Sequence, residues 1–147
     1  MIKKSGMVDI GGKKETRRVA VAEVFVRLPV DIMGRIKKND IPKGDVLETA
    51  RVAGIMAAKK TSELIPLCHN IAVDSVDIEF LFRRDGLLIR SRVKAIAKTG
   101  VEMEAMASCA IAALTIYDMC KMFSRAIQIT DLCLIEKRGG KGGVYRR

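Results

Sequence analysis

Hydrophobic patterns typical of strands alternate along the chain with patterns typical of helices. Residues 17–28 are rich in Val and Phe with few breakers, which predicts a strand with both faces partly buried. Residues 76–83 alternate apolar with mostly charged side chains, and this period of two predicts a half-exposed strand. The dipeptide Asp85-Gly86 then predicts a hairpin turn. A last apolar stretch, 127–136, predicts the final strand.

The strand that returns from the hairpin turn separates its side chains by character. Its apolar side chains from Leu87 to Ala95 fall on one face, and Arg90, Arg92 and Lys94 fall on the other. These cations would lie beside the acids of the preceding strand, because opposite residues of two antiparallel strands are neighbours. This pairing predicts a structural role for the charges.

Helical patterns lie between the predicted strands. A short polar helix begins at Pro29, and a second spans 45–60 with an Asp-x-x-Glu capping box at its start. A long helix spans 99–121, and we expect Thr99 to cap it together with Glu102. With the two longer helices counted, the order of elements is β-α-β-β-α-β.

This order predicts the fold class α+β, a ferredoxin-like antiparallel sheet with its helices packed on one face. The length suits a single domain over residues 1–147, which buries a core without disulfides or metal. We expect flexible termini at about 1–15 and 138–147, the second because it is rich in glycine. The ferredoxin-like arrangement hosts many unrelated functions, so activity must be argued from side chains.

The long predicted helix carries acids at both ends and few polar residues between them. Glu104 and Asp118 lie fourteen positions apart, which at 1.5 Å per residue separates them by about 21 Å. A single small-ligand pocket in one subunit does not easily use both. If both ends serve one reaction, the site is expected at an interface between two copies of the chain.

Composition favours an anionic partner. The chain has 27 Lys and Arg against 17 Asp and Glu, a formal net charge of +10, which suits nucleic acid, acidic lipid or a phosphorylated small molecule. The four cysteines form no C-x-x-C pair, so we expect reduced thiols and a cytoplasmic protein. The N-terminus shows no apolar signal segment, and the Ala-rich run 105–114 is shorter than the ~20 residues of a spanning helix. Neither secretion nor membrane insertion is indicated.

Two features near the middle of the chain are candidates for chemistry, each with a structural alternative. Lys43 precedes a predicted helix start, where free amides and the helix dipole favour an anion, but a solvated lysine is the alternative. Cys68 and His69 place a thiol beside the only imidazole, although adjacent side chains usually point apart and a loop histidine is the alternative. The other cysteines lack metal-ligand spacing, so no metal site is predicted.

The end of the long helix offers a third candidate. Asp118 and Lys121 lie at positions i and i+3, so they form either a simple surface ion pair or a carboxylate that orients an ammonium beside a substrate. The apolar helix body before them must be covered on most sides, which favours a place beside a buried cleft.

The segment Gly-Gly-Lys-Gly-Gly at 139–143 resembles a phosphate loop only loosely. A Walker motif requires Ser or Thr after its lysine and a helix beyond it, and neither follows here. A flexible lid that closes lysines over a polyphosphate fits the composition better, and a disordered tail is the alternative.

Two other classes of function compete with an enzyme. Ferredoxin-like sheets with basic surfaces also bind RNA, but aromatic residues make up only 4% of the chain and no RNP1-like strand is present, so few stacking platforms exist. A structural or regulatory homo-oligomer without catalysis would leave the charges at the ends of the long helix unexplained.

A series of motifs runs in one order through nearly the whole chain. They are Met7-Val8-Asp9-Ile10, Thr16, Arg18, Lys43-Gly44-Asp45-Val46, Thr49-Ala50-Arg51, Ala53-Gly54-Ile55, Leu64-Ile65-Pro66-Leu67-Cys68-His69, Thr99-Gly100-Val101-Glu102-Met103-Glu104-Ala105, Ala113-Leu114-Thr115-Ile116-Tyr117-Asp118-Met119-Cys120-Lys121, Lys137 and Gly139-Gly140-Lys141. In this order they resemble the cyclic pyranopterin monophosphate synthase family of molybdenum cofactor biosynthesis.

The resemblance implies a lyase that converts (8S)-3',8-cyclo-7,8-dihydroguanosine 5'-triphosphate into cyclic pyranopterin monophosphate and diphosphate. It implies no metal and no other cofactor, and a small-molecule triphosphate rather than nucleic acid or membrane as the partner. It further implies a homohexamer, a trimer of dimers with active sites at the subunit interface.

The resemblance also implies roles for particular residues. Lys43 and Lys121 would be the acid/base groups, with Asp118 orienting Lys121 and His69 near the base or sugar of the substrate. The residues that would line the substrate site are Leu67, Cys68, His69, Glu102, Met103 and Glu104. The residues that would hold phosphates are Arg18, Lys137 and Lys141.

Overall fold

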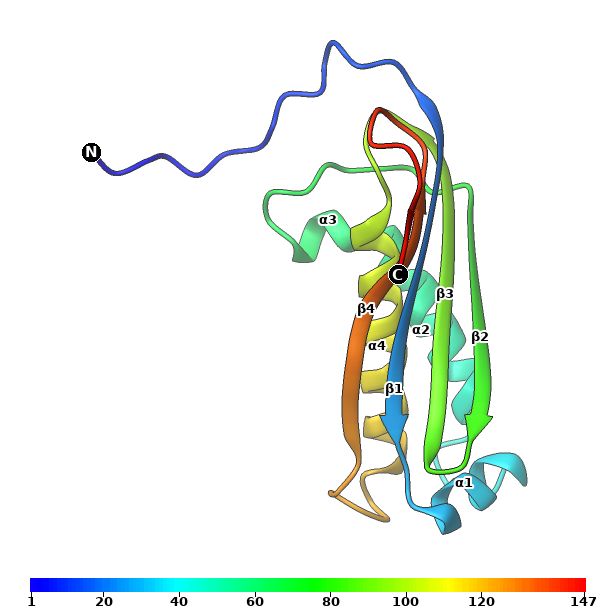
Figure 1. Ribbon diagram of the computed structural model, residues 1–147. Coiled ribbons are helices and arrows are strands. Elements are labelled where there is room, and N and C mark those ends of the chain that lie inside the picture. Colours follow the sequence, from blue (N-terminus) through cyan, green and yellow to red (C-terminus); the bar gives the residue numbers. More distant parts are fainter.

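The computed structural model describes all residues 1–147 and contains a five-stranded antiparallel sheet with helices on one face (Figure 1). The elements in chain order are β1 (Thr16–Arg27), α1 (Val30–Lys37), α2 (Val46–Lys59), α3 (Thr61–Leu64), β2 (Ser75–Arg83), β3 (Gly86–Ala97), α4 (Glu102–Cys120), β4 (Gln128–Arg138) and β5 (Tyr145–Arg146). The strands lie in the order β2-β3-β1-β4-β5. The first four give the ferredoxin-like arrangement, so the predicted fold class is confirmed.

The β2–β3 hairpin has its turn one residue earlier than predicted. Arg83 pairs with Gly86, so the two turn residues are Arg84 and Asp85. Gly86 is paired within the sheet, and a Cβ atom there would approach the ring of Phe25 to 2.7 Å. The glycine therefore serves a close packing contact at the start of β3, directly after the turn.

The charged face of β3 has the structural role that the sequence predicted. Arg90 forms an ion pair of 2.6 Å with Glu23 of β1 and a longer one of 3.9 Å with Glu79 of β2. Asp77 and Arg92 are direct neighbours in the register of the two strands. The acidic and basic side chains thus tie β1, β2 and β3 together on the face that carries no helix.

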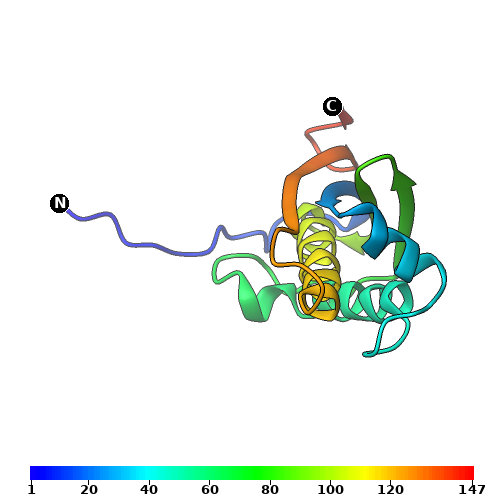
Figure 2. The same ribbon diagram turned by 90° about the horizontal axis from the view of Figure 1, so that it is seen from below.

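The core lies between the sheet and the helices α2 and α4, which run side by side under one face (Figure 2). On β1, every second residue from Ala20 to Val26 is fully buried. α4 packs small residues such as Ala105, Cys109 and Ala112 into this face, all of them fully buried. By length and composition α4 could cross a membrane, but it is the central core helix of this fold.

The two predicted helix caps have different outcomes. The Asp45 carboxylate accepts a hydrogen bond of 3.0 Å from the backbone N–H of Glu48, so the cap of α2 is confirmed. The predicted cap of α4 is wrong, because Val101 holds the cap position and no side chain accepts from the first turn. Glu102 pairs instead with Lys137 of β4 at 3.6 Å, and this long-range ion pair overrides the local motif.

The two ends of the chain differ in structure. Residues 1–15 form no helix or strand, and their first part projects away from the body in both views (Figures 1 and 2). At the other end, β4 continues to Arg138, and the chain then turns back so that β5 pairs with β4. The glycine-rich tail therefore contains a short strand that its composition did not predict.

Gly54 generates a prediction about core packing. A Cβ atom on this α2 residue would approach the Cδ1 atom of Ile78 to 2.5 Å and the backbone oxygen of Ser108 to 3.0 Å. Gly54→Ala is therefore expected to lower the free energy of unfolding by about 1–3 kcal/mol through overpacking. Thermal unfolding should show a lower midpoint than that of the parent protein.

Gly34→Ala provides the matched control, because this α1 glycine has open space around its Cα. Alanine there should leave the midpoint unchanged or raise it, since it improves helix propensity by about 0.5–1 kcal/mol. Equal effects of the two substitutions would contradict the packing account.

Candidate active site

One end of the fold holds a cavity of about 660 Å³ lined entirely by polar, charged and glycine residues. We call it the basic pocket and define it by its lining residues Gly12, Lys13, Lys14, Thr16, Arg18, Thr99, Gly100, Glu102, Lys137, Gly140, Lys141 and Gly142. They come from the segment before β1, the start of β1, the β3–α4 connection, the first residue of α4, the end of β4 and the chain between β4 and β5. Five are cationic and a single one is acidic, so the pocket is built for an anion.

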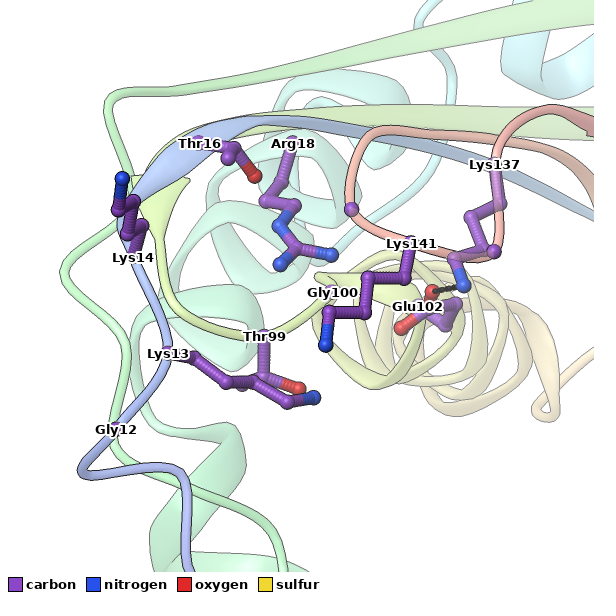
Figure 3. Close-up of a pocket in the computed structure, with 12 residues that line it drawn as sticks. Gly12, Lys13, Lys14, Thr16, Arg18, Thr99, Gly100, Glu102, Lys137 and Lys141 are labelled. Atoms are coloured by element: carbon purple, nitrogen blue, oxygen red, sulfur yellow. Dashed lines mark ion pairs between the residues drawn. The ribbon is translucent and has the colours of Figure 1, made fainter.

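Arg18 is the most buried cation of the basic pocket. Its side chain is 7% exposed, and its Nη2 donates to the backbone oxygen of Lys98 at 3.1 Å. No carboxylate pairs with it. Figure 3 shows Arg18, Lys13 and Lys141 pointing toward a common space, whereas the amino end of Lys14 turns outward at the rim. A buried guanidinium with backbone partners alone keeps its charge available for a ligand.

The N-terminus of α4 faces the same cavity through Gly100 and Glu102. Because no side chain caps this helix, its first-turn amides are available to an anion, and the helix dipole adds positive potential. The Glu102 carboxylate lies 3.6 Å from the Lys137 ammonium and is the one acidic side chain of the pocket.

The opposite end of α4 carries the second group of predicted residues. We call Lys43, Asp118 and Lys121 the lysine cluster. Lys43 Nζ lies 2.9 Å from one carboxylate oxygen of Asp118, and Lys121 Nζ lies 3.0 Å from the other. Lys43 also donates to the backbone oxygen of Asp118 at 3.2 Å. The structure therefore brings together the two lysines expected to be acid/base groups and the carboxylate expected to orient Lys121.

Asp118 holds the lysine cluster together as a charged group. The hydrogen bonds from Lys43 and then from Lys121 lower the pKa of Asp118 from its usual value. The carboxylate therefore stays ionised near neutral pH and keeps both ammonium groups within reach of one space. All three side chains are about half exposed, and the expected buried cleft beside them is not formed within one chain.

His69 lies apart from the lysine cluster, at the end of the fold where α4 begins. Its Nε2 atom lies 2.6 Å from the backbone oxygen of Val8, so it contacts the segment before β1. Cys68 donates from its thiol to the Ile65 backbone oxygen at 3.2 Å. Burial and then the Glu104 charge raise the pKa of Cys68, so its thiol stays protonated and is a poor nucleophile.

The remaining predicted substrate residues lie near His69. Leu67 and Met103 are 48% and 37% exposed, which is high for large apolar side chains. Glu104 is 3% exposed, and burial raises its pKa. The predicted site residues thus form two groups at the two ends of α4, as the helix-length argument required.

Several residues of the basic pocket escaped the sequence analysis. Lys13 and Lys14 were hidden by their place in a segment expected to be flexible, and Thr99 was assigned to a helix cap instead of the pocket. Thr16 was assigned no role, because the predicted strand began at residue 17. β1 begins at Thr16, which places Thr16 on the same face as Arg18, a residue already expected to hold phosphate. No group of three His, Cys, Asp or Glu side chains is placed to hold a metal ion.

Fold and site together define a ferredoxin-like α+β protein with a cationic pocket suited to an oligophosphate. A model of the MoaC family matches residues 7–140. Several relatives are named cyclic pyranopterin monophosphate synthase. The one from Novosphingobium aromaticivorans is 49% identical over 95% of this chain and 89% of the relative's length. The one from Listeria innocua is 50% identical over 98% of this chain and 91% of the relative's length. A third relative, from Heliobacterium modesticaldum, is 50% identical over 96% of this chain and 90% of the relative's length. The chain belongs to the MoaC family.

The buried carboxyl of Glu104 generates a prediction about pH. Burial raises its pKa, so the native state binds this proton more tightly than the unfolded chain. The free energy of unfolding therefore falls as pH rises from about 4, the usual carboxyl range, through the raised native value. Glu104→Gln should have a higher melting midpoint than the parent protein at pH 8, and the gap should narrow at pH 4.

Glu63→Gln is the matched control, because Glu63 is an exposed residue of α3. Its midpoint should follow that of the parent protein at both pH values. A stabilisation by Glu104→Gln that is largest at pH 4 would contradict the burial argument.

Proposed function

We propose that this protein is a cyclic pyranopterin monophosphate synthase. It converts (8S)-3',8-cyclo-7,8-dihydroguanosine 5'-triphosphate into cyclic pyranopterin monophosphate and diphosphate, without a metal or other cofactor. The observation that carries the proposal is the pairing of the basic pocket with the lysine cluster at the two ends of α4. Family membership and the names of its relatives support the choice of substrate.

The basic pocket suits the triphosphate. A cyclic phosphate forms when a substrate hydroxyl bonds to the α-phosphorus and the bond to the leaving diphosphate breaks. Arg18, Lys137 and Lys141 would neutralise the charge that grows on the departing oxygen, a contribution on the order of 3 kcal/mol per donor. Lys13 and the uncapped backbone amides at the start of α4 would add further donors to the phosphate groups.

The lysine cluster suits the proton transfers. Rebuilding the ring system moves protons onto and off nitrogen and oxygen atoms, and paired ammonium groups serve as proton donors and, once deprotonated, as bases. Asp118 fixes the two nitrogens on opposite oxygens of one carboxylate. His69, Cys68, Leu67, Met103 and Glu104 would contact the ring end of the substrate.

A complete site is proposed to need two copies of the chain. Glu104 and Asp118 are about 21 Å apart along one rigid helix, which is too far for one small substrate to touch both ends. The helices also expose apolar side chains that a second copy would cover, namely Val52, Met56, Met103 and Leu114. We therefore propose a cytoplasmic homohexamer, a trimer of dimers with sites at the subunit interface, that acts without nucleic acid or membrane.

The direct test supplies the purified protein with the cyclised triphosphate and measures diphosphate together with a fluorescent oxidised pterin. Lys121→Met and Lys43→Met should each lower kcat by about 10²–10⁴, the usual contribution of a general acid or base. Lys59→Met is the control, since Lys59 is an exposed lysine of α2 outside both groups. Full activity in either cluster variant would remove that lysine from the mechanism.

Sharing of the site is tested by mixing inactive subunits. Lys121→Met subunits lack a lysine of the cluster, and Lys137→Met, Lys141→Met subunits lack two pocket cations. If each site uses one end from each copy, half the dimers in an equal mixture are mixed and one of their two sites is intact. Activity should then recover to about a quarter of the parent value.

A second mixture controls for this recovery. Lys121→Met and Lys43→Met subunits are both defective in the lysine cluster, so no combination restores a site. Subunit exchange is verified in each case by native mass spectrometry with isotope-labelled chains. Absence of recovery in the first mixture, despite exchange, would contradict a shared site.

A further inference from the structure

The chain between β4 and β5, residues 139–144, is fixed at both of its ends. We call these residues the strap. Before it, Arg138 of β4 still pairs with Val19 of β1. After it, β5 pairs with β4, and the backbone N–H of Arg147 donates to the Ile135 oxygen at 2.9 Å. The strap is therefore a closed loop on the sheet edge and does not behave as a free tail.

The strap has a defined path over the basic pocket. Gly139, Gly140 and Gly143 adopt φ values of +101°, +76° and +65°, which favour glycine. A Cβ atom on Gly140 would overlap the guanidinium of Arg18, so the strap rests directly on this buried cation. The Gly143 N–H donates to the Gly140 oxygen at 3.3 Å, which places Lys141 in a tight turn.

Glu136 lies at the base of this loop, between a cation of the strand that precedes the strap and a cation of the strand that follows it. Its Oε1 atom accepts from Arg138 Nε at 2.5 Å, and its Oε2 atom lies 3.5 Å from Arg146 Nε. These arginines and the charge of Arg92 on β3 lower the pKa of Glu136, with the Arg138 hydrogen bond as the largest cause. The carboxylate is therefore ionised near neutral pH and links the strand before the strap to the strand after it.

β5 has no part in the core. Both of its residues are exposed, and its strand pairing and its ion pair reach only β4. Loss of β5 should thus leave the folded body intact and act on the strap. That makes the contribution of β5 separable from general stability.

We propose that Glu136 and Arg146 are positioning residues that latch the strap, so that Lys141 is held over the basic pocket before the oligophosphate arrives. This inference rests on the proposed function for the identity of the anion. Ordering a six-residue loop at the moment of binding would lower affinity, and the latch avoids that loss through pre-organisation. The latch should therefore act on substrate binding and leave the chemical step unchanged.

Three variants test the latch in the full-length oligomeric enzyme. Glu136→Gln and Arg146→Ala should raise KM about twofold to fivefold, the range for an ion pair at the protein surface, with kcat unchanged within about twofold. A chain that ends at Val144 lacks β5 and should raise KM about tenfold or more, because the Lys141 contact with phosphate is then unsupported. Arg84→Ala, which removes one exposed cation from the distant β2–β3 turn, should match the parent enzyme.

Limited proteolysis gives a readout that needs no activity. Trypsin cleavage after Lys141, followed by intact mass, should be several times faster in each latch variant than in the parent protein or in Arg84→Ala. Saturating tripolyphosphate should slow this cleavage in the parent protein and less so in the latch variants. Melting midpoints should stay within about 2 °C of the parent, which separates a local effect from unfolding.

The two proposals fail in different ways. The latch would be overturned if all three latch variants had the same KM and the same trypsin cleavage rate as the parent protein. This holds whichever substrate the parent enzyme converts. Latch variants in which kcat and the melting midpoint both fall would also overturn the latch, because joint losses indicate a general structural role. Failure of the parent protein to release diphosphate, with faster cleavage in the latch variants, would overturn the proposed activity and support the latch.

Discussion

The burial of α4 against β1 and α2 is the constraint on which the rest of the structure depends. Small residues such as Ala105, Ala112 and Ala113 let the helix lie close to the sheet, and Gly54 lets α2 come equally close from the side. A helix held along its whole length cannot bend to bring its ends together. Its burial therefore fixes both the position of the basic pocket at one end and its separation from the lysine cluster at the other.

Charge is distributed unequally between the two faces of the sheet and the two ends of α4. On the face without helices, cations such as Arg90 are paired with acids of neighbouring strands, so their charges are neutralised within the fold. In the basic pocket, Arg18 has backbone partners and no acid, and Lys13 and Lys141 have no ion pair. Cations that repel one another at close range destabilise the folded state, and a bound polyanion relieves this repulsion. The unpaired charges are thus better explained by a ligand than by stability.

The sequence predicted the elements well where the signal was local, and it failed where a distant contact decided the outcome. The period-two pattern of β2 and the Asp45 cap of α2 need only neighbouring residues, and both were found. Thr99 satisfied the same local rule, but Glu102 pairs with Lys137, a residue 35 positions later, and the cap is absent. β5 likewise depends on pairing across the strap, while composition reports only glycine content. Lys13 became part of the pocket because β1, α4 and the strap converge there, which no single segment encodes.

The exposure of the lysine cluster and the burial of Arg18 in the basic pocket point to different tasks. Arg18 is held by the fold in its binding position, whereas Lys43 and Lys121 are about half exposed in a single chain. In water, an ammonium beside Asp118 interacts only weakly with a substrate, because the solvent screens its charge. Covering the cluster with a second copy would expel that water and strengthen every interaction there, while Asp118 keeps both lysines in place. Association of two chains would then complete the geometry of the site and also supply low-polarity surroundings that favour proton transfer from lysine to a bound substrate.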